Sequence, residues 1–282
     1  MLMTHEAVVR LGFFFGILVL VAVGELLFPR RVLRTGKAVR WVSNLAVVAI
    51  DTLAVRLFFP VLAVGVAIAA QKQGWGLLPL LALPEWLSVL IGILVLDLVI
   101  YLQHVMFHTV PLLWRLHMMH HADLDIDVTT GLRFHPIEIV LSMAIKMTVV
   151  AALGPPAMAV ILFEVILNGT AMFNHGNLKL PLALDRSLRL LVVTPDMHRV
   201  HHSVIIRETS SNVGFNFPWW DRLFGTYRPQ PVRGHEEMVI GLAQFRDPSK
   251  NNLWHLLVMP FTDPPGAYAI NRHGIDPEQL RQ

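Results

Sequence analysis

The sequence predicts an all-α protein that crosses a membrane several times and carries a histidine-rich helical cap on the cytoplasmic side. Three observations support this prediction. The 282-residue chain is 54% hydrophobic and 15% charged, whereas ordinary soluble domains contain about 25% charged residues. Its apolar residues form runs long enough to span a bilayer. Its histidines recur three and four residues apart, a spacing that places side chains on one face of a helix.

The first two apolar runs predict an N-terminal transmembrane region. The first run covers residues 8–28, and because no convincing signal-peptidase site follows it, we expect a retained helix. The second run covers residues 42–70. It is interrupted by Asp51, Arg56 and Pro60, which predicts either one long kinked helix or a helix with an interfacial segment before it.

Two further apolar runs belong to the predicted catalytic part of the chain. Residues 86–103 form the third run, which contains Asp97. A carboxylate within a membrane helix is by default a functional hypothesis, and Asp97 is a candidate for orienting metal ligands through a hydrogen bond. The fourth run, residues 137–173, is split by a Gly-Pro-Pro sequence at 154–156, which predicts a helical hairpin.

Basic residues between the first two runs predict the orientation of the chain. Five of them stand close together: Arg30, Arg31, Arg34, Lys37 and Arg40. Loops of this kind face the cytoplasm, so we expect the N-terminus outside and every histidine group on the cytoplasmic side. The expected location is the inner or plasma membrane. We divide the chain into a transmembrane region (1–85), a catalytic domain (86–230) and a cytoplasmic tail (231–282).

Ten of the 14 histidines are candidate metal ligands. "HVMFH" contains one pair, "HMMHH" and "HRVHH" contain triplets with the same i, i+3, i+4 spacing, and two single histidines stand at helix ends. The ten are His104, His108, His117, His120, His121, His135, His175, His198, His201 and His202. Imidazole binds iron, zinc, copper or nickel, and ten groups exceed the four ligands of a tetrahedral zinc. The sequence therefore predicts two adjacent metals. The other four histidines, His5, His235, His255 and His273, are interpreted as surface residues.

The absence of cysteine limits the chemistry that the chain can do alone. Without a thiolate it has no internal iron–sulfur cluster, so any electrons must come from another protein. The net charge of +3 does not indicate a nucleic-acid partner, because the basic residues lie in short clusters beside apolar runs, as at membrane boundaries.

Five stretches between residues 90 and 230 resemble the fatty acid hydroxylase/sterol desaturase superfamily. They are "DLVIYLQHVMFHTVPLLWRLHMMHHAD", "FHPIE", "NHGN", "HRVHHS" and "NVGFNFPWWDRLFGTY". The family's first box often reads His-Arg-x-x-His, and this chain has Val105 at the arginine position. The resemblance implies a membrane-bound non-haem di-iron oxygenase whose box histidines bind the metals. Such an enzyme hydroxylates or desaturates a bilayer lipid with O2 and two electrons from a reductase or ferredoxin-type donor.

Two other functions are alternatives to a lipid oxygenase. A zinc-dependent membrane hydrolase usually carries a general-base motif such as HExxH, which is absent here. A metal transporter or sensor would place its ligands near the bilayer midplane, whereas these histidines stand beside Arg115, Asp123, Asp196 and Arg199. Hydroxylation is favoured over desaturation because nothing in the sequence enforces the removal of a second hydrogen.

Overall fold

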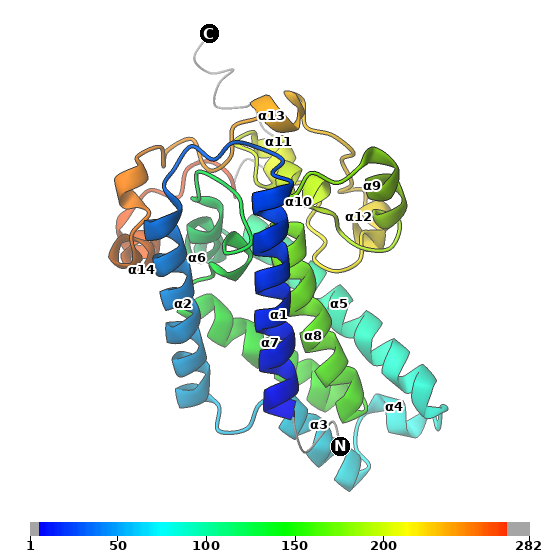
Figure 1. Ribbon diagram of the computed structural model, residues 1–282. Helices are drawn as coiled ribbons and strands as arrows, with labels where there is room; N and C mark the ends of the chain where they lie inside the picture. The colour runs from blue at the N-terminus through cyan, green and yellow to red at the C-terminus, as the bar shows by residue number, and fades with distance from the viewer. Residues whose placement is uncertain (1–5, 270–282) are drawn as a thin grey trace.

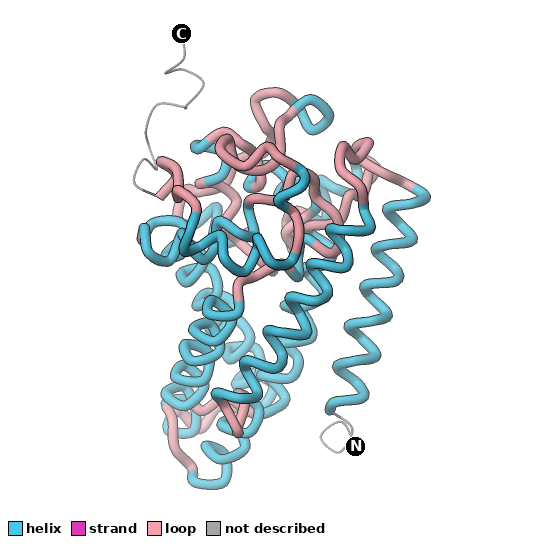
Figure 2. Tube along the Cα trace, turned by 90° about the vertical axis from the view of Figure 1, so that its left-hand side faces the viewer, coloured by secondary structure: helices cyan, strands magenta, loops and turns pink. Residues whose placement is uncertain are grey.

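The computed structural model describes residues 6–269 as a bundle of long helices with a compact cap at one end (Figure 1). Figure 2 shows helices joined by loops, and no named strand occurs among the described residues. The bundle consists of α1 (Glu6–Leu27), α2 (Lys37–Phe58), α3 (Ala63–Gln73), α4 (Leu77–Leu80), α5 (Glu85–Thr109), α7 (Pro136–Leu153) and α8 (Ala157–Asn174). The predicted all-α class is confirmed.

The cap is built from short helices and the loops between them. Its helices are α6 (Pro111–His121), η1 (Thr130–Leu132), α9 (Leu182–Leu188), α10 (Pro195–His201), α11 (Ile206–Thr209), α12 (Trp219–Leu223), α13 (Gly234–Glu237), η2 (Pro248–Lys250) and α14 (Leu253–Thr262). Since the cap interrupts the bundle after α5 and again after α8, the chain enters it twice with histidine-bearing segments.

Five segments among the described residues are long and apolar enough to cross a membrane. They are Val8–Leu27, Lys37–Leu80, Glu85–Thr109, Pro136–Leu153 and Ala157–Asn174. Many of their large apolar side chains, such as Leu20 and Leu57, are exposed on the bundle surface, which suits contact with lipid rather than water. The prediction of a polytopic membrane protein is confirmed.

The second apolar region breaks into separate helices at Pro60. Helix α2 ends at Phe58, Phe59 is extended, and α3 begins at Ala63. Proline restricts the residue before it to extended conformations, so the chain turns here instead of kinking. Small residues of α3, including Ala67, then pack against α7 and α8 at the end of the bundle opposite the cap (Figure 1).

The predicted hairpin is present, with its turn at Gly154. This residue has φ +62°, a left-handed conformation that glycine adopts without a Cβ clash. A Cβ at Gly154 would lie 2.4 Å from the carbonyl oxygen of Trp75. The turn therefore needs glycine both for its backbone angle and for the close approach of the segment before α4.

The last turns of α1 and the segment after residue 230 both contribute to the cap. Glu25 of α1 is buried and accepts hydrogen bonds from the backbone N–H of Val128 (2.7 Å) and of Asn177 (2.8 Å). In the segment interpreted as a tail, Leu256 of α14 packs with Trp114 of α6 in one apolar cluster. The tail thus supports a histidine-bearing helix, and the division at 85 and 230 stays a prediction.

Candidate metal centre

Nine of the ten predicted histidines gather into two adjacent clusters inside the cap. The first cluster contains His104, His108, His117, His121 and His201, and the second contains His120, His175, His198 and His202. Within each cluster the potential ligand atoms all lie within 4.8 Å of one another, and every ring is buried. The clusters touch, since the rings of His121 and His202 stack with centroids 4.6 Å apart.

Each triplet supplies ligands to both clusters. In α6, His117 and His121 face the first cluster and His120 faces the second. The second triplet, at α10, has the reverse arrangement: His198 and His202 face the second cluster, whereas His201 faces the first. Residues i and i+4 of a helix differ in direction by about 40°, whereas residue i+3 lies about 60° from i on the other side and about 100° from i+4. One short helix can therefore serve two metals. The repeated spacing thus has a geometric reason.

Hydrogen bonds fix which ring nitrogen faces the cluster. Backbone carbonyl oxygens accept from the Nδ1–H groups of four rings: His104 (Val213, 2.7 Å), His120 (Arg133, 3.2 Å), His175 (Ala171, 2.7 Å) and His201 (Ser211, 2.9 Å). The Nδ1–H of His117 donates to Glu138 Oε1 at 2.8 Å. A carbonyl can only accept, so Nδ1 carries the proton and Nε2 of each neutral ring keeps its lone pair.

These lone pairs face one another, which is unfavourable without a cation between them. The Nε2 atom of His104 lies 3.1 Å from Nε2 of His117 and 3.2 Å from Nε2 of His201. In the second cluster, the Nε2 atoms of His120 and His175 are 3.1 Å apart. Two nitrogens about 2.1 Å from one metal are separated by roughly 3.0 Å at a right angle. The donor set and its spacing therefore fit one metal in each cluster.

Burial keeps the imidazoles neutral. It lowers the pKa of His117 to about 3 and that of His175 to about 3, well below the usual value near 6.5. Neutral imidazole is the form that binds a metal, so the cap maintains the ligand-competent state at physiological pH.

A buried ion-pair network holds the loop that follows α6. Arg40 of α2 binds both carboxylate oxygens of Asp123, at 2.7 and 2.9 Å, and also Asp127 at 2.8 Å. Burial opposes the ionisation of Asp123, but Arg40 and Arg133 outweigh it and hold its pKa below the usual range. Since Asp123 stands two residues after His121, this network fixes the end of the first triplet.

The structure places His135 and Asp97 away from both clusters. The Nδ1 atom of His135 accepts from the backbone N–H of Ile137 (3.2 Å) and so caps α7, while Nε2 lies 3.2 Å from the carbonyl oxygen of Leu257. Asp97 accepts from the indole N–H of Trp220 at 2.7 Å. The carboxylate that does orient a cluster histidine is Glu138.

Two of the histidines interpreted as surface residues can be examined. His235 is buried, and its Nε2 lies 2.9 Å from Gln230 Oε1, so the surface interpretation is wrong for it. His255 is partly buried and lies 3.0 Å from Asp263. His5 and His273 lie outside the described residues.

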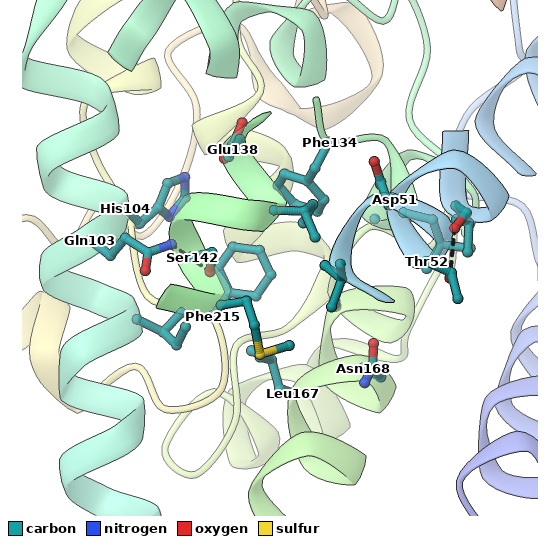
Figure 3. Close-up of a pocket in the computed structure, with 18 of the residues that line it drawn as sticks. Asp51, Thr52, Gln103, His104, Phe134, Glu138, Ser142, Leu167, Asn168 and Phe215 are labelled. Atoms are coloured by element: carbon teal, nitrogen blue, oxygen red, sulfur yellow. Dashed lines mark hydrogen bonds between the residues drawn. The ribbon is translucent and has the colours of Figure 1, made fainter. Parts of the chain in front are cut away.

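A cavity of about 350 Å³ within the bundle reaches the first cluster (Figure 3). Its end nearest the cap is formed by His104, His117, Phe134, Glu138 and Phe215, and the other lining residues come mainly from α1, α2, α5, α7 and α8. Phe134 stacks on His120 with centroids 4.5 Å apart, and the ring of Phe215 lies 5.4 Å from that of His104. An apolar cavity inside membrane helices thus ends at the buried imidazoles.

Comparison with known proteins agrees with this geometry. Residues 89–226 match the fatty acid hydroxylase family. The resemblance drawn from the five stretches is thereby confirmed, and the fatty acid hydroxylase region includes all nine clustered histidines. No solved structure matches the chain significantly.

Curated relatives of the chain include an ornithine lipid hydroxylase and alkylglycerol monooxygenases. The chain is 28% identical to the ornithine lipid hydroxylase OlsE of Rhizobium tropici over 52% of this chain and 44% of that protein. It is 28% identical to the alkylglycerol monooxygenase of Xenopus tropicalis (64% of this chain, 39% of that protein) and 27% identical to that of Homo sapiens (56% and 33%). The chain spans less than half the length of these relatives.

Three polar residues near the site were not singled out from the sequence. Arg40 lies outside the fatty acid hydroxylase region and was used only for orientation. Asp51 and Gln103 line the cavity, but Asp51 was read as an interruption of an apolar run. The rule applied to Asp97, that a carboxylate within a membrane helix is a functional hypothesis, would have selected Asp51 as well.

Proposed function

We propose that this protein is an integral-membrane dimetal oxygenase that hydroxylates a lipid with O2 and two external electrons. The observation that carries the proposal is the pair of histidine clusters whose Nε2 lone pairs converge next to a cavity inside the membrane helices. Nine neutral ligands exceed the need of one zinc, so this arrangement favours a dimetal oxygenase over a zinc hydrolase.

Two iron ions, held by His104, His108, His117, His121 and His201 on one side and by His120, His175, His198 and His202 on the other, are the proposed cofactor. When bound, they would supply the activation of O2. The chain's own residues orient the imidazoles through Nδ1 and exclude water by burial. Phe134 and Phe215 separate the second cluster from the cavity, so the lipid would meet the first cluster.

The cavity supports entry of the substrate from the bilayer. Thr52 and Arg56 line it and are exposed on α2, so a lipid chain can enter from the side of the bundle. The names of the relatives, a lipid hydroxylase and monooxygenases, favour insertion of one oxygen over desaturation.

Electrons must come from a partner, because the chain has no cysteine for an iron–sulfur cluster. We propose a reductase or ferredoxin-type donor on the cytoplasmic side of an inner or plasma membrane. Purified, iron-loaded protein should turn over only when such a donor is added. Sustained product formation with O2 and no reductant would contradict this part of the proposal.

The function can be tested by lipid mass spectrometry of cells that express the native chain or a variant under ¹⁸O₂. Native protein should produce a lipid that carries one ¹⁸O atom, and His201→Ala should abolish it. His135→Ala is the matched control and should keep the product, because His135 lies outside both clusters. A lipid that loses two hydrogens without gaining oxygen would indicate desaturation, and an unchanged lipid profile would contradict the proposal.

A further inference from the structure

Three buried oxygen atoms around the cavity lack hydrogen-bond partners. They are Asp51 Oδ1, Gln103 Oε1 and Glu138 Oε2, and all three residues line the cavity. Asp51 is 7% exposed and Glu138 is 4% exposed. In Figure 3, Gln103 and Asp51 stand on opposite sides of the cavity, and Glu138 closes it near His104.

The neighbouring polar groups are already used elsewhere. The amide nitrogen of Gln103 donates to Ser142 at 2.8 Å, which leaves its oxygen as an acceptor. Glu138 uses Oε1 to accept from His117 and leaves Oε2. At the other end of the cavity, Arg10 pairs with Glu164 at 2.8 Å. Among the described residues, none of these three oxygens accepts a hydrogen bond from a basic side chain.

Unpartnered acceptors at this depth are costly, because a buried oxygen loses its hydration without replacement. Three of them around one cavity would be compensated by a ligand that donates hydrogen bonds. A phosphate anion offers only acceptors, so it cannot donate a hydrogen bond to any of the three oxygens. Hydroxyl or ammonium groups on a lipid supply the missing donors.

We propose that the cavity binds a lipid whose polar end donates hydrogen bonds, through hydroxyl or ammonium groups, to Asp51, Gln103 and Glu138. This inference rests on the proposed function and makes it more specific. Gln103 precedes His104, and Glu138 contacts His117. The bound polar group is therefore next to the first cluster, and the oxidised carbon lies close to that group rather than far along a plain acyl chain.

Lipid binding to the purified protein in detergent, measured by native mass spectrometry, tests the proposal without turnover. Two pairs of probes separate the two donors: monooleoylglycerol against its dimethyl ether, and oleylamine against its N-trimethyl derivative. In at least one pair, the donor lipid should bind about tenfold more tightly, as expected for one hydrogen bond. The pair that shows the preference identifies the donor as hydroxyl or ammonium.

Substitutions at two neighbouring positions of α2 provide the matched comparison. Asp51→Leu should lower the preference because it removes one of the three acceptors, and Asp51→Asn should lower it less because the amide keeps an acceptor oxygen. Thr52→Val removes a neighbouring cavity hydroxyl that already donates to the Val48 carbonyl oxygen at 2.8 Å, so it should leave the preference unchanged.

Equal binding of both members of each pair by the native protein would overturn the proposal and would mean that water satisfies these acceptors. If that protein still incorporated ¹⁸O into a lipid, the proposed function would stand without this inference. If the protein showed a clear donor preference but never oxidised lipid, this inference would stand and the proposed function would fail. The two failures are therefore distinguishable.

Discussion

His135 and His175 both stand at ends of membrane helices, yet only His175 has other imidazoles within hydrogen-bonding distance. Its Nε2 atom lies 3.1 Å from that of His120 and 3.0 Å from that of His198. His135 instead accepts a backbone N–H at the start of α7. At the scale of the residue, the hydrogen-bond partner of each ring nitrogen distinguishes a histidine that can bind a metal from one that caps the start of a helix.

Replacing these two histidines by alanine should have different effects on metal content. His175→Ala should remove the metal of the second cluster, because it deletes an imidazole that faces two other ligands. His135→Ala should keep both metals and lose about 1 kcal/mol of stability, the usual value of a helix cap. Elemental analysis and thermal unfolding measure the two quantities. Equal metal loss in both variants would show that His135 is a ligand after all.

His235 should make stability depend on pH. Burial lowers its pKa to about 4, and Arg199 and Arg30 add to this although Asp196 opposes it. The unfolded imidazole takes up a proton near pH 6.5, whereas the folded one does not. The contribution of neutral His235 to the free energy of unfolding is therefore fully present above pH 6.5 and is lost as the pH falls towards 4.

The measurement compares thermal unfolding of native protein and His235→Gln at pH 7.5 and pH 5. Native protein should lose on the order of 1–2 kcal/mol more than the variant between these two values, because the variant has no imidazole to protonate on unfolding. Parallel losses in the two proteins would mean that His235 is protonated in the folded cap.

At the scale of the element, α6 depends on a helix that lies far from it in the sequence. Arg40 of α2 holds Asp123 and Asp127, and all three side chains are at most 1% exposed. Removing one partner of a buried ion pair usually costs about 3–5 kcal/mol, because the remaining charge stays buried. The guanidinium thus supports the position of His120 and His121 without touching either ring.

Arg40→Met should therefore destabilise the protein by about 3–5 kcal/mol and reduce metal binding. Arg34→Met is the control, because the Arg34 side chain is exposed and the substitution removes the same charge. Arg40→Lys should be intermediate, since an ammonium cannot reproduce the bidentate contact with Asp123. Thermal unfolding and metal analysis provide the test. Full metal content and native stability in Arg40→Met would contradict a positioning role.

The helices were largely predictable from the sequence, whereas the contacts between helices were not. Apolar run lengths and the Gly-Pro-Pro turn were sufficient to predict the long helices and the hairpin, because both are local properties. Helical spacing predicted that each triplet shares a face, but the assignment of His120 and His201 to opposite clusters depends on how α6 and α10 meet. For the same reason, the Arg40–Asp123 pair, 83 residues apart, leaves no local signal.

At the scale of the whole molecule, the loop between α1 and α2 lies at the same end of the bundle as the histidine-bearing helices α6 and α10 (Figure 1). Arg30 pairs with Asp196 at 3.3 Å, and the side chain of Arg31 donates to the carbonyl oxygen of Met238 at 2.7 Å. The loop is therefore part of the cap, and both must face the same side of the membrane. The positive-inside rule favours the cytoplasm.

Cysteine labelling of intact cells can test this orientation, since the native chain contains no cysteine. Ser203 is buried and would be a poor labelling site, whereas Arg34 and Arg207 are exposed in the cap and Gln73 is exposed at the opposite end. Arg34→Cys and Arg207→Cys should resist a membrane-impermeant maleimide until the cells are opened, and Gln73→Cys should react at once. The reverse pattern would place the metal centre outside the cell and exclude a cytoplasmic electron donor. Labelling of Arg34→Cys and Arg207→Cys from different sides would contradict the fold itself, because the two parts of the cap could not meet.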